Sequence, residues 1–135
     1  MANRYGEAAL MAVRMETYGK ALTAAERWQD AVKKLYPTTP AGQKKEGPRA
    51  AFLGLCEAGL VKNMPAGPPS APNRNKDYAV EAVRLLREDG QRSISQLWAA
   101  VSAGDAVEHA SQMDVVLALW KNGLIVDSQV RTAAQ

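Results

Sequence analysis

One pattern of three stretches occurs twice in this chain of 135 residues, and it constrains the fold more than any other feature. Each copy closes on an apolar run that ends in Gly-Leu followed by Val or Ile. The matching stretches are 5–14 with 78–87, 23–28 with 93–98, and 52–61 with 116–125. The pattern indicates two copies of one supersecondary unit, although amphipathic helical stretches of similar composition also align by chance.

The composition favours helices packed into one domain. Hydrophobic residues make up 47% of the chain, aromatic residues only 6%, and alanine is abundant. A chain of this length can bury one core but not two large independent ones. Because alanine favours helices over a sheet built from Val, Ile, Tyr and Phe, we predict an all-α fold with one compact domain over residues 1–126.

Helix signals divide the first copy, residues 3–61, into three helices. Thr23 and Glu26 have the spacing of a capping box, in which each side chain accepts a hydrogen bond from the other residue's backbone N–H. Pro48 suits the first turn of a third helix, and Gly59 is placed to end it. The first copy therefore predicts a three-helix unit.

The second copy, residues 75–125, is predicted to hold three more helices. Ser93 or Ser95 is placed to cap the second of them, and Ser111 with Asp114 the third. The two three-helix units would then pack together into the single domain.

A proline-rich connector, residues 62–74, separates the copies, because its four prolines and one glycine suit neither a helix nor a central strand. The tail, residues 127–135, has little to bury and is expected to be flexible. With a lone cysteine, no export signal and no apolar run long enough for a membrane, the sequence predicts a soluble cytoplasmic protein.

Few residues could carry catalysis or hold a metal. Cys56 and His109 are the only cysteine and histidine, and Cys56 falls on the apolar stripe of a predicted helix, where a thiol acts as a small hydrophobic side chain. One cysteine and one histidine do not make a structural zinc site. We therefore predict no catalytic residues, no metal and no cofactor.

Positive charge gathers in the first part of the chain. Residues 1–76 hold twelve Lys and Arg against six Asp and Glu, whereas residues 77–135 hold five against eight. Such a patch can contact phosphate groups near a helix amino terminus, be an ordinary solvated face, or attract the acidic half of a second copy to form a homo-oligomer. The predicted anion or nucleic-acid patch is Lys33, Lys34, Lys44, Lys45, Arg49 and Lys62.

A three-helix unit of this pattern is typical of helix-turn-helix modules that bind DNA, but also of scaffolds that bind proteins. The helix that would enter the groove of DNA offers only Gln112 and Lys121 for contacts with bases. DNA or RNA binding is therefore an alternative to protein binding, and not the first prediction.

Three stretches resemble an uncharacterised family of small bacterial proteins, which is grouped as a domain of unknown function. These stretches are Phe52-Leu-Gly-Leu-Cys-Glu-Ala-Gly-Leu-Val61, Asn75-Lys-Asp-Tyr-Ala79 and Gln112-Met-Asp-Val-Val-Leu-Ala-Leu-Trp120. The resemblance covers most of the chain and implies no activity and no functional residues. It draws attention to Asn75, Lys76 and Tyr78, which close the proline-rich connector beside a possible cleft between the two halves.

Those three residues also have a structural interpretation, since Asn75 can cap a helix and Tyr78 can pack in the core. Taken together, the sequence predicts a non-enzymatic helical interaction or regulatory module that binds a protein partner. Nucleic-acid binding through the basic first copy is one alternative. The other is a small-molecule binder or enzyme that uses the cleft at the connector.

Overall fold

Helices account for the regular secondary structure of the described residues, apart from one isolated β-bridge. The computed structural model describes residues 4–64, 71–103, 105 and 109–126. The helices are α1 (Tyr5–Arg14), α2 (Ala24–Leu35), the four-residue α3 (Pro40–Gln43), α4 (Glu46–Glu57), α5 (Arg74–Glu88), α6 (Ile94–Val101) and α7 (Gln112–Lys121). The predicted all-α class is therefore confirmed. The predicted tail and residues 65–70 of the connector lie outside the described residues.

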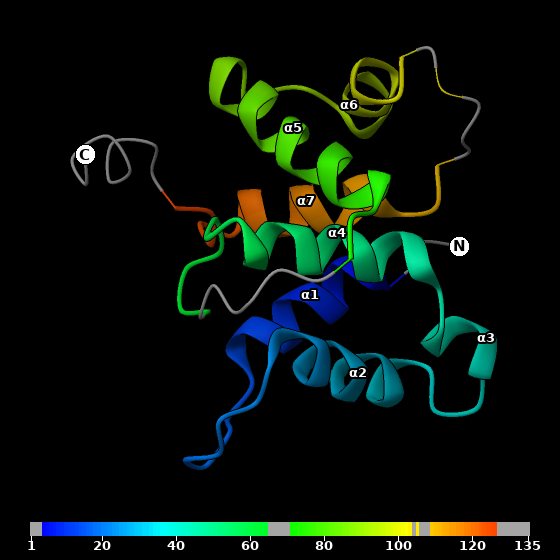
Figure 1. The fold of residues 1–135 in the computed structure, drawn as a ribbon, viewed down its shortest axis with the longest axis vertical. Coiled ribbons are helices and arrows are strands. Elements are labelled where there is room, and N and C mark those ends of the chain that lie inside the picture. The colour runs from blue at the N-terminus through cyan, green and yellow to red at the C-terminus, as the bar shows by residue number, and fades with distance from the viewer. Residues whose placement is uncertain (1–3, 65–70, 104, 106–108, 127–135) are drawn as a thin grey trace.

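The helices surround a central pair, α4 and α7, which pack against each other (Figure 1). On one side of this pair α5 contacts both α4 and α7, and α6 packs against α5. On the other side α1 contacts α7, and α2 packs against α1. The indole of Trp28 stacks on the ring of Phe52 with centroids 5.2 Å apart. Both side chains are buried, so they join α2 to α4 within the core.

Two helices begin with the same pair of reciprocal hydrogen bonds. At α2 the Thr23 N–H donates to Glu26 Oε1 over 2.8 Å and the Glu26 N–H to Thr23 Oγ1 over 3.1 Å. At α6 the Ser93 N–H donates to Gln96 Oε1 over 2.8 Å and the Gln96 N–H to Ser93 Oγ over 3.1 Å. The predicted capping box at Thr23 is confirmed, and Ser93 rather than Ser95 caps α6.

The predicted start of α5 was wrong, and at α7 the predicted capping by the Ser111 side chain was wrong. Asn73 caps α5 by accepting from the Asn75 N–H over 2.8 Å, so this helix begins at Arg74, inside the predicted connector. Ser111 occupies the cap position of α7 but has a left-handed φ of 73° and makes no capping hydrogen bond with its side chain. Instead His109 Nε2 accepts a 3.1 Å hydrogen bond from the Met113 N–H in the first turn of α7.

Helices α4 and α7 also end in the same way. Gly59 and Gly123 adopt φ values of +74° and +71°, which glycine reaches without a clash of Cβ, so the predicted cap at Gly59 is confirmed. Beyond them, Val61 and Ile125 form the antiparallel bridge. The Lys62 N–H donates to the Leu124 carbonyl and the Val126 N–H to the Leu60 carbonyl, each over 2.8 Å, which joins the two helix ends.

Candidate functional site

A pocket of about 700 Å³ lies along α4, between the start of α2 and the segment that leads into α5. We call it the α4 groove. It is lined by residues 20–25 and Arg27 on one side, by Glu46, Arg49, Ala50, Leu53, Cys56 and Glu57 on its floor, and by residues 71–73 with Lys76 on the other side. This volume is typical of sites for small organic molecules.

The floor of the α4 groove is one face of a helix. Its six α4 residues recur at spacings of three and four positions, which places them along a single stripe about 16 Å long. The middle of the stripe is apolar, with Ala50 and Leu53, and the facing wall carries Ala24 and Ala25. Because three of these four side chains are only methyl groups, the helices pack without filling the space between them.

Two ion pairs lie at opposite ends of the floor. Arg49 Nη1 lies 3.5 Å from Glu46 Oε1, one turn away on the same helix. Lys76 Nζ lies 3.2 Å from Glu57 Oε1 and 2.8 Å from the Ala71 carbonyl, and its side chain is only 13% exposed. The Lys76–Glu57 pair thereby ties the start of α5 to the end of α4, and it is better shielded from water than the Glu46–Arg49 pair.

Two further cations, Lys20 and Arg27, line the α4 groove, and of these Arg27 is partly buried. Its Nη1 donates to the Ala12 carbonyl over 3.2 Å, while its Nε–H is buried and has no hydrogen-bond partner in the described part of the chain. No carboxylate of a described residue lies within ion-pair distance of this guanidinium. Arg27 therefore lines the pocket without a carboxylate partner among the described residues.

Cys56 lies on the groove floor but is not a nucleophile. Its side chain is 2% exposed, and burial raises the pKa of the thiol to about 12, with the negative charge of Glu57 acting in the same direction and Arg27 opposing it. The thiolate is the reactive form of cysteine, so the thiol is inert near neutral pH.

The three residues predicted for a cleft separate in the structure. Lys76 lines the α4 groove. Asn75 Oδ1 accepts a 2.8 Å hydrogen bond from the side-chain amide of Gln112, which is buried. Tyr78 is also buried; its hydroxyl donates to Asp105 over 2.6 Å, and its ring packs edge-on against Trp98. Asn75 and Tyr78 thus take part in interactions that join α5 to its neighbours, away from the groove lining.

Four residues of the predicted basic patch are exposed around α3. Lys33 and Lys34 occupy the last turn of α2, where positive side chains complement the partial negative charge of the helix end. Lys44 and Lys45 occupy the link between α3 and α4. Lys44 and Lys45 directly precede α4, whereas Lys34 lines a hollow beside α1.

The other two patch residues lie elsewhere. Arg49 lines the α4 groove and pairs with Glu46. Lys62 follows the carboxyl end of α4, at the bridge to residues 124–126, and helix α4 of about 18 Å separates it from Lys45. The six residues therefore do not form one continuous patch.

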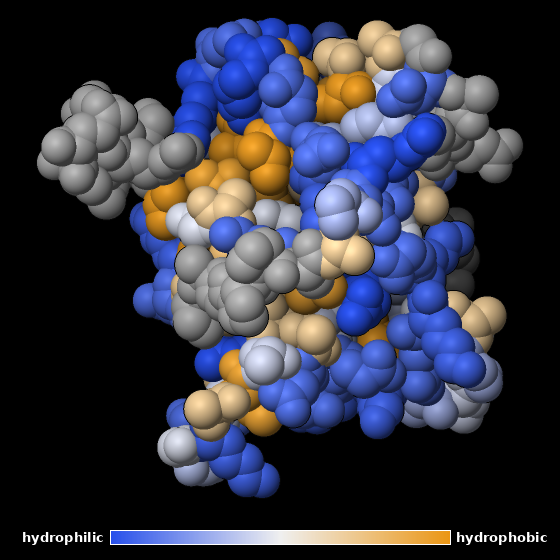
Figure 2. All heavy atoms as spheres, in the orientation of Figure 1, coloured by the Kyte–Doolittle hydropathy of each residue, from blue (hydrophilic) through white to orange (hydrophobic). Residues whose placement is uncertain are grey.

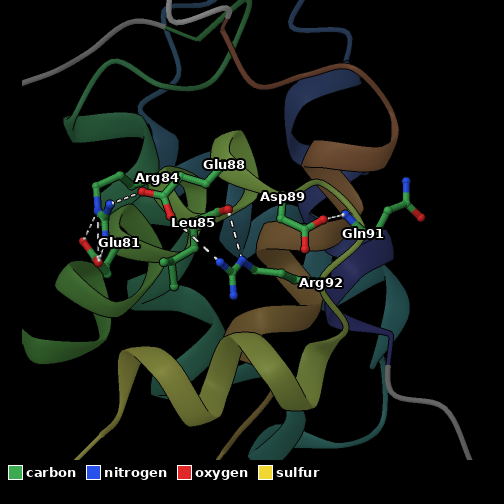
Figure 3. Close-up of polar contacts among 7 residues, drawn as sticks. All are labelled: Glu81, Arg84, Leu85, Glu88, Asp89, Gln91 and Arg92. Atoms are coloured by element: carbon green, nitrogen blue, oxygen red, sulfur yellow. Dashed lines mark hydrogen bonds and ion pairs between the residues drawn. The ribbon is translucent and has the colours of Figure 1, made fainter.

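Two acidic residues of the second half, Glu81 and Glu88, form local ion pairs (Figure 3). Arg84 hydrogen-bonds with Glu81 over 3.0 Å and with Glu88 over 2.6 Å, both on α5. Arg92 Nε donates to the Leu85 carbonyl over 3.2 Å and so satisfies the end of that helix. These pairs offset the negative charge of Glu81 and Glu88.

Gln112, one of two residues suggested for contact with bases, is 2% exposed. Its Oε1 accepts a 2.6 Å hydrogen bond from the Ala110 N–H, and its side-chain Nε2 donates to Asn75 Oδ1. It is unable to reach a nucleic acid, so that suggestion was wrong for this residue. Lys121 is exposed at the end of α7. Among the described residues, no three His, Cys, Asp or Glu side chains gather to hold a metal ion, and no helix is long and apolar enough to cross a membrane.

Sequence reasoning missed Arg27, Glu46 and Glu57 as site residues. No motif marks them, since each is a single charged residue on an amphipathic helix, and only the packing of α2 against α4 brings them to one pocket. The one available signal was the spacing of residues 46, 49, 50, 53, 56 and 57, which puts charged and small side chains on the same face.

Comparison with known proteins identifies the family but no relative of known activity. A search of curated proteins and a search of solved structures each found no match. The family described as a family of unknown function, DUF6979, matches residues 2–126. This range includes all seven helices and every residue of the α4 groove. The resemblance to a domain of unknown function is thereby confirmed, and the protein belongs to DUF6979.

Proposed function

We propose that this protein is a non-catalytic binding module that takes up a small organic molecule in the α4 groove. The observation that carries the proposal is a hollow of about 700 Å³ with an apolar middle and charged ends, built from three separate chain segments. Pockets that bind small molecules combine apolar walls with a few placed polar groups in this way. The proposal selects the cleft alternative raised by the sequence and places it along α4.

The apolar middle of the groove supplies affinity. A ligand that covers Leu53, Ala50 and the alanines of α2 removes apolar surface from water, which stabilises the complex by about 25 cal/mol for each Å² buried. The charged residues at both ends select ligands of a matching length. Figure 2 shows hydrophobic and hydrophilic atoms side by side in the band between α4 and α2, as expected for a mixed site.

The state of the reactive side chains supports binding without catalysis. The Cys56 thiol is buried and protonated near neutral pH, and the ring of His109 accepts a backbone hydrogen bond at the start of α7. His109 is absent from the groove lining. A thiolate paired with a histidine base, one arrangement used in covalent catalysis, is therefore missing from the described lining of the groove.

A filling mutation tests the proposal. Ala25→Phe places an aromatic ring at the wall of the groove, whereas Ala99→Phe adds the same ring at an exposed position of α6. We expect a library of small organic molecules, screened by ligand-observed NMR, to yield compounds that bind the wild type and Ala99→Phe but not Ala25→Phe. A library without binders, or binders that Ala25→Phe retains, would contradict the proposal.

Binding of a protein or nucleic-acid partner stays a prediction, and it rests on fewer observations than ligand binding in the α4 groove. The exposed lysines around α3 favour a phosphate-bearing partner, with Lys44 and Lys45 the most prominent. Fluorescence anisotropy with labelled DNA and RNA at about 50 mM and 200 mM salt tests this idea. Binding that falls with salt and disappears in the Lys44→Ala/Lys45→Ala variant would support it, and binding that the variant retains would contradict it.

We also propose that α1, α2 and α4 repeat as α5, α6 and α7. Three observations support this: the two capping boxes have the same hydrogen bonds, α4 and α7 end in glycines of similar φ, and the bridge exchanges equivalent hydrogen bonds between equivalent residues. The pairing of α1 with α7 and of α5 with α4 is also what a twofold relation between the units requires.

A further inference from the structure

We infer that the ligand of the α4 groove is an organic anion, with its acid group bound at Arg27 and its apolar part lying on Leu53 and Ala50. The inference rests on the proposed function, because it names the chemical class of ligand for the same pocket. It is argued from the balance of charge in the groove and from the surroundings of Arg27.

The groove has more positive than negative side chains. Its lining contains the four cations Lys20, Arg27, Arg49 and Lys76 and the two carboxylates Glu46 and Glu57. Both carboxylates are already paired, one with Arg49 and the other with Lys76. Two cations therefore remain without a carboxylate among the described residues. Lys20 is exposed at the rim, where water solvates its ammonium, whereas Arg27 is partly buried at the wall.

An unmatched guanidinium in this position is costly to the folded protein. Charged groups lose hydration when they are buried, and the loss is repaid only by an opposite charge or by hydrogen bonds. Arg27 has one hydrogen bond, from Nη1 to the Ala12 carbonyl, and its Nε–H has no partner among the described residues. A ligand anion at the groove wall supplies the missing charge, so the same feature that destabilises the free protein favours the complex.

The surroundings of Arg27 also define the rest of the ligand. Arg27 acts on the titration of Cys56, which places its charge near the Cys56 end of the floor. From there the floor continues through Leu53 to Ala50, which are apolar. The space between these two residues and α2 is the open part of the groove. An acid group at Arg27 thus points an attached hydrocarbon or aromatic body along the apolar middle of the groove. Arginine suits this task, because its guanidinium is always charged and its hydrogen bonds to a carboxylate are charge-assisted.

Matched acids and alcohols test the inference directly. The probes are octanoate, decanoate and indole-3-acetate, each compared with its neutral counterpart, 1-octanol, 1-decanol or indole-3-ethanol, in isothermal titration calorimetry. We expect the acids to bind more tightly than the alcohols, and added salt to weaken only the acids. Arg27→Met is expected to weaken acid binding by about tenfold to a hundredfold and to leave alcohol binding unchanged.

The matched control is Arg14→Met, which removes an exposed arginine that does not line the groove. This control should bind every probe as the wild type does. If Arg27→Met fails to fold, NMR of the wild type decides the question. The Nε–H signal of Arg27, assigned by its loss in Arg27→Lys, should shift when decanoate is added and stay in place with 1-decanol.

The outcomes separate the inference from the function on which it rests. Alcohols that bind as tightly as acids, or an Nε–H signal that decanoate leaves unmoved, would overturn the role of Arg27 while groove binding survives. If neither acids nor alcohols bind, and the library also yields no compound that Ala25→Phe excludes, the proposed function itself is wrong.

Discussion

A methyl group at Gly54 of α4 would lie 2.7 Å from the Cα atom of Lys76 in α5, so these two helices cross with no space for a side chain at position 54. The close crossing also positions Lys76 to reach Glu57 at the end of the groove. Gly54 is therefore tied to the geometry of the candidate site as well as to packing.

The first prediction concerns this crossing. Alanine normally stabilises a helix interior relative to glycine by up to about 1 kcal/mol. Gly54→Ala is expected to do the opposite and lower the free energy of unfolding by about 1–3 kcal/mol, because the helices must move apart. Urea titration measures the loss. Gly90→Ala is the control, since its added Cβ would meet Trp120 at an ordinary 3.5 Å. A Gly54→Ala protein as stable as the wild type would refute the tight crossing.

The second prediction concerns the two capping boxes. Thr23→Ala and Ser93→Ala each remove the acceptor of the N3 N–H group and should each lower the free energy of unfolding by about 1 kcal/mol. The comparison is Ser95→Ala, because Ser95 lies exposed within α6 and does not cap it. Equal stability of Ser93→Ala and Ser95→Ala would mean that the box at α6 contributes nothing.

The third prediction is that the Cys56 thiol does not react in the folded protein. Because burial raises its pKa to about 12, a thiol reagent at pH 8 should meet almost no thiolate. Labelling is expected to be slow in buffer and rapid in denaturant. In buffer, the labelling rate should be set by how often the protein unfolds. Fast labelling of the folded protein would place Cys56 in contact with solvent and reopen a catalytic role.

The fourth prediction is a loss of stability in mild acid. Burial lowers the pKa of His109 in the folded protein, with Asp114 acting in the opposite direction, and the neutral ring accepts the Met113 N–H. The unfolded chain takes up this proton near pH 6.5, before the folded chain does. The stability from His109 is thus complete above that pH and is lost as the pH falls toward the lower folded-state pKa.

The measurement is urea unfolding between about pH 7 and pH 5, together with NMR titration of the ring. His109→Ala serves as the control, and it should be less stable than the wild type but show a smaller dependence on pH in this window. Since the chain has one histidine, the ring signal needs no further assignment. A folded-state pKa at or above 6.5 would contradict the capping role.

Local signals in the sequence predicted the fold well. The capping box at Thr23 and the end of α4 at Gly59 depend on residues within a few positions of one another, so they could be identified without knowledge of the packing. Ser111 shows where such reasoning fails. Its spacing suits a cap, but the left-handed backbone at this residue leaves the capping hydrogen bond to His109.

The candidate site was harder to predict, because it depends on distant segments. Lys76 was identified from its place after the connector, and it does line the groove. Asn75 and Tyr78 also follow the connector, but they contact other helices. Asn75 accepts a hydrogen bond from Gln112 of α7, and the ring of Tyr78 packs against Trp98 of α6. Arg27 carries no signal at all, since its place in the proposed site depends on the lack of a carboxylate partner among the described residues, which only the fold reveals.

The bridge between Val61 and Ile125 also determines when the protein can finish folding during synthesis. Val61 lies near the middle of the chain and Ile125 follows α7, and α1 likewise depends on α7 for its packing. Helices α1, α2 and α4 leave the ribosome long before α7 does, so their apolar faces stay exposed until nearly the whole chain has been made. The core of the nascent chain therefore stays incomplete until α7 has been made.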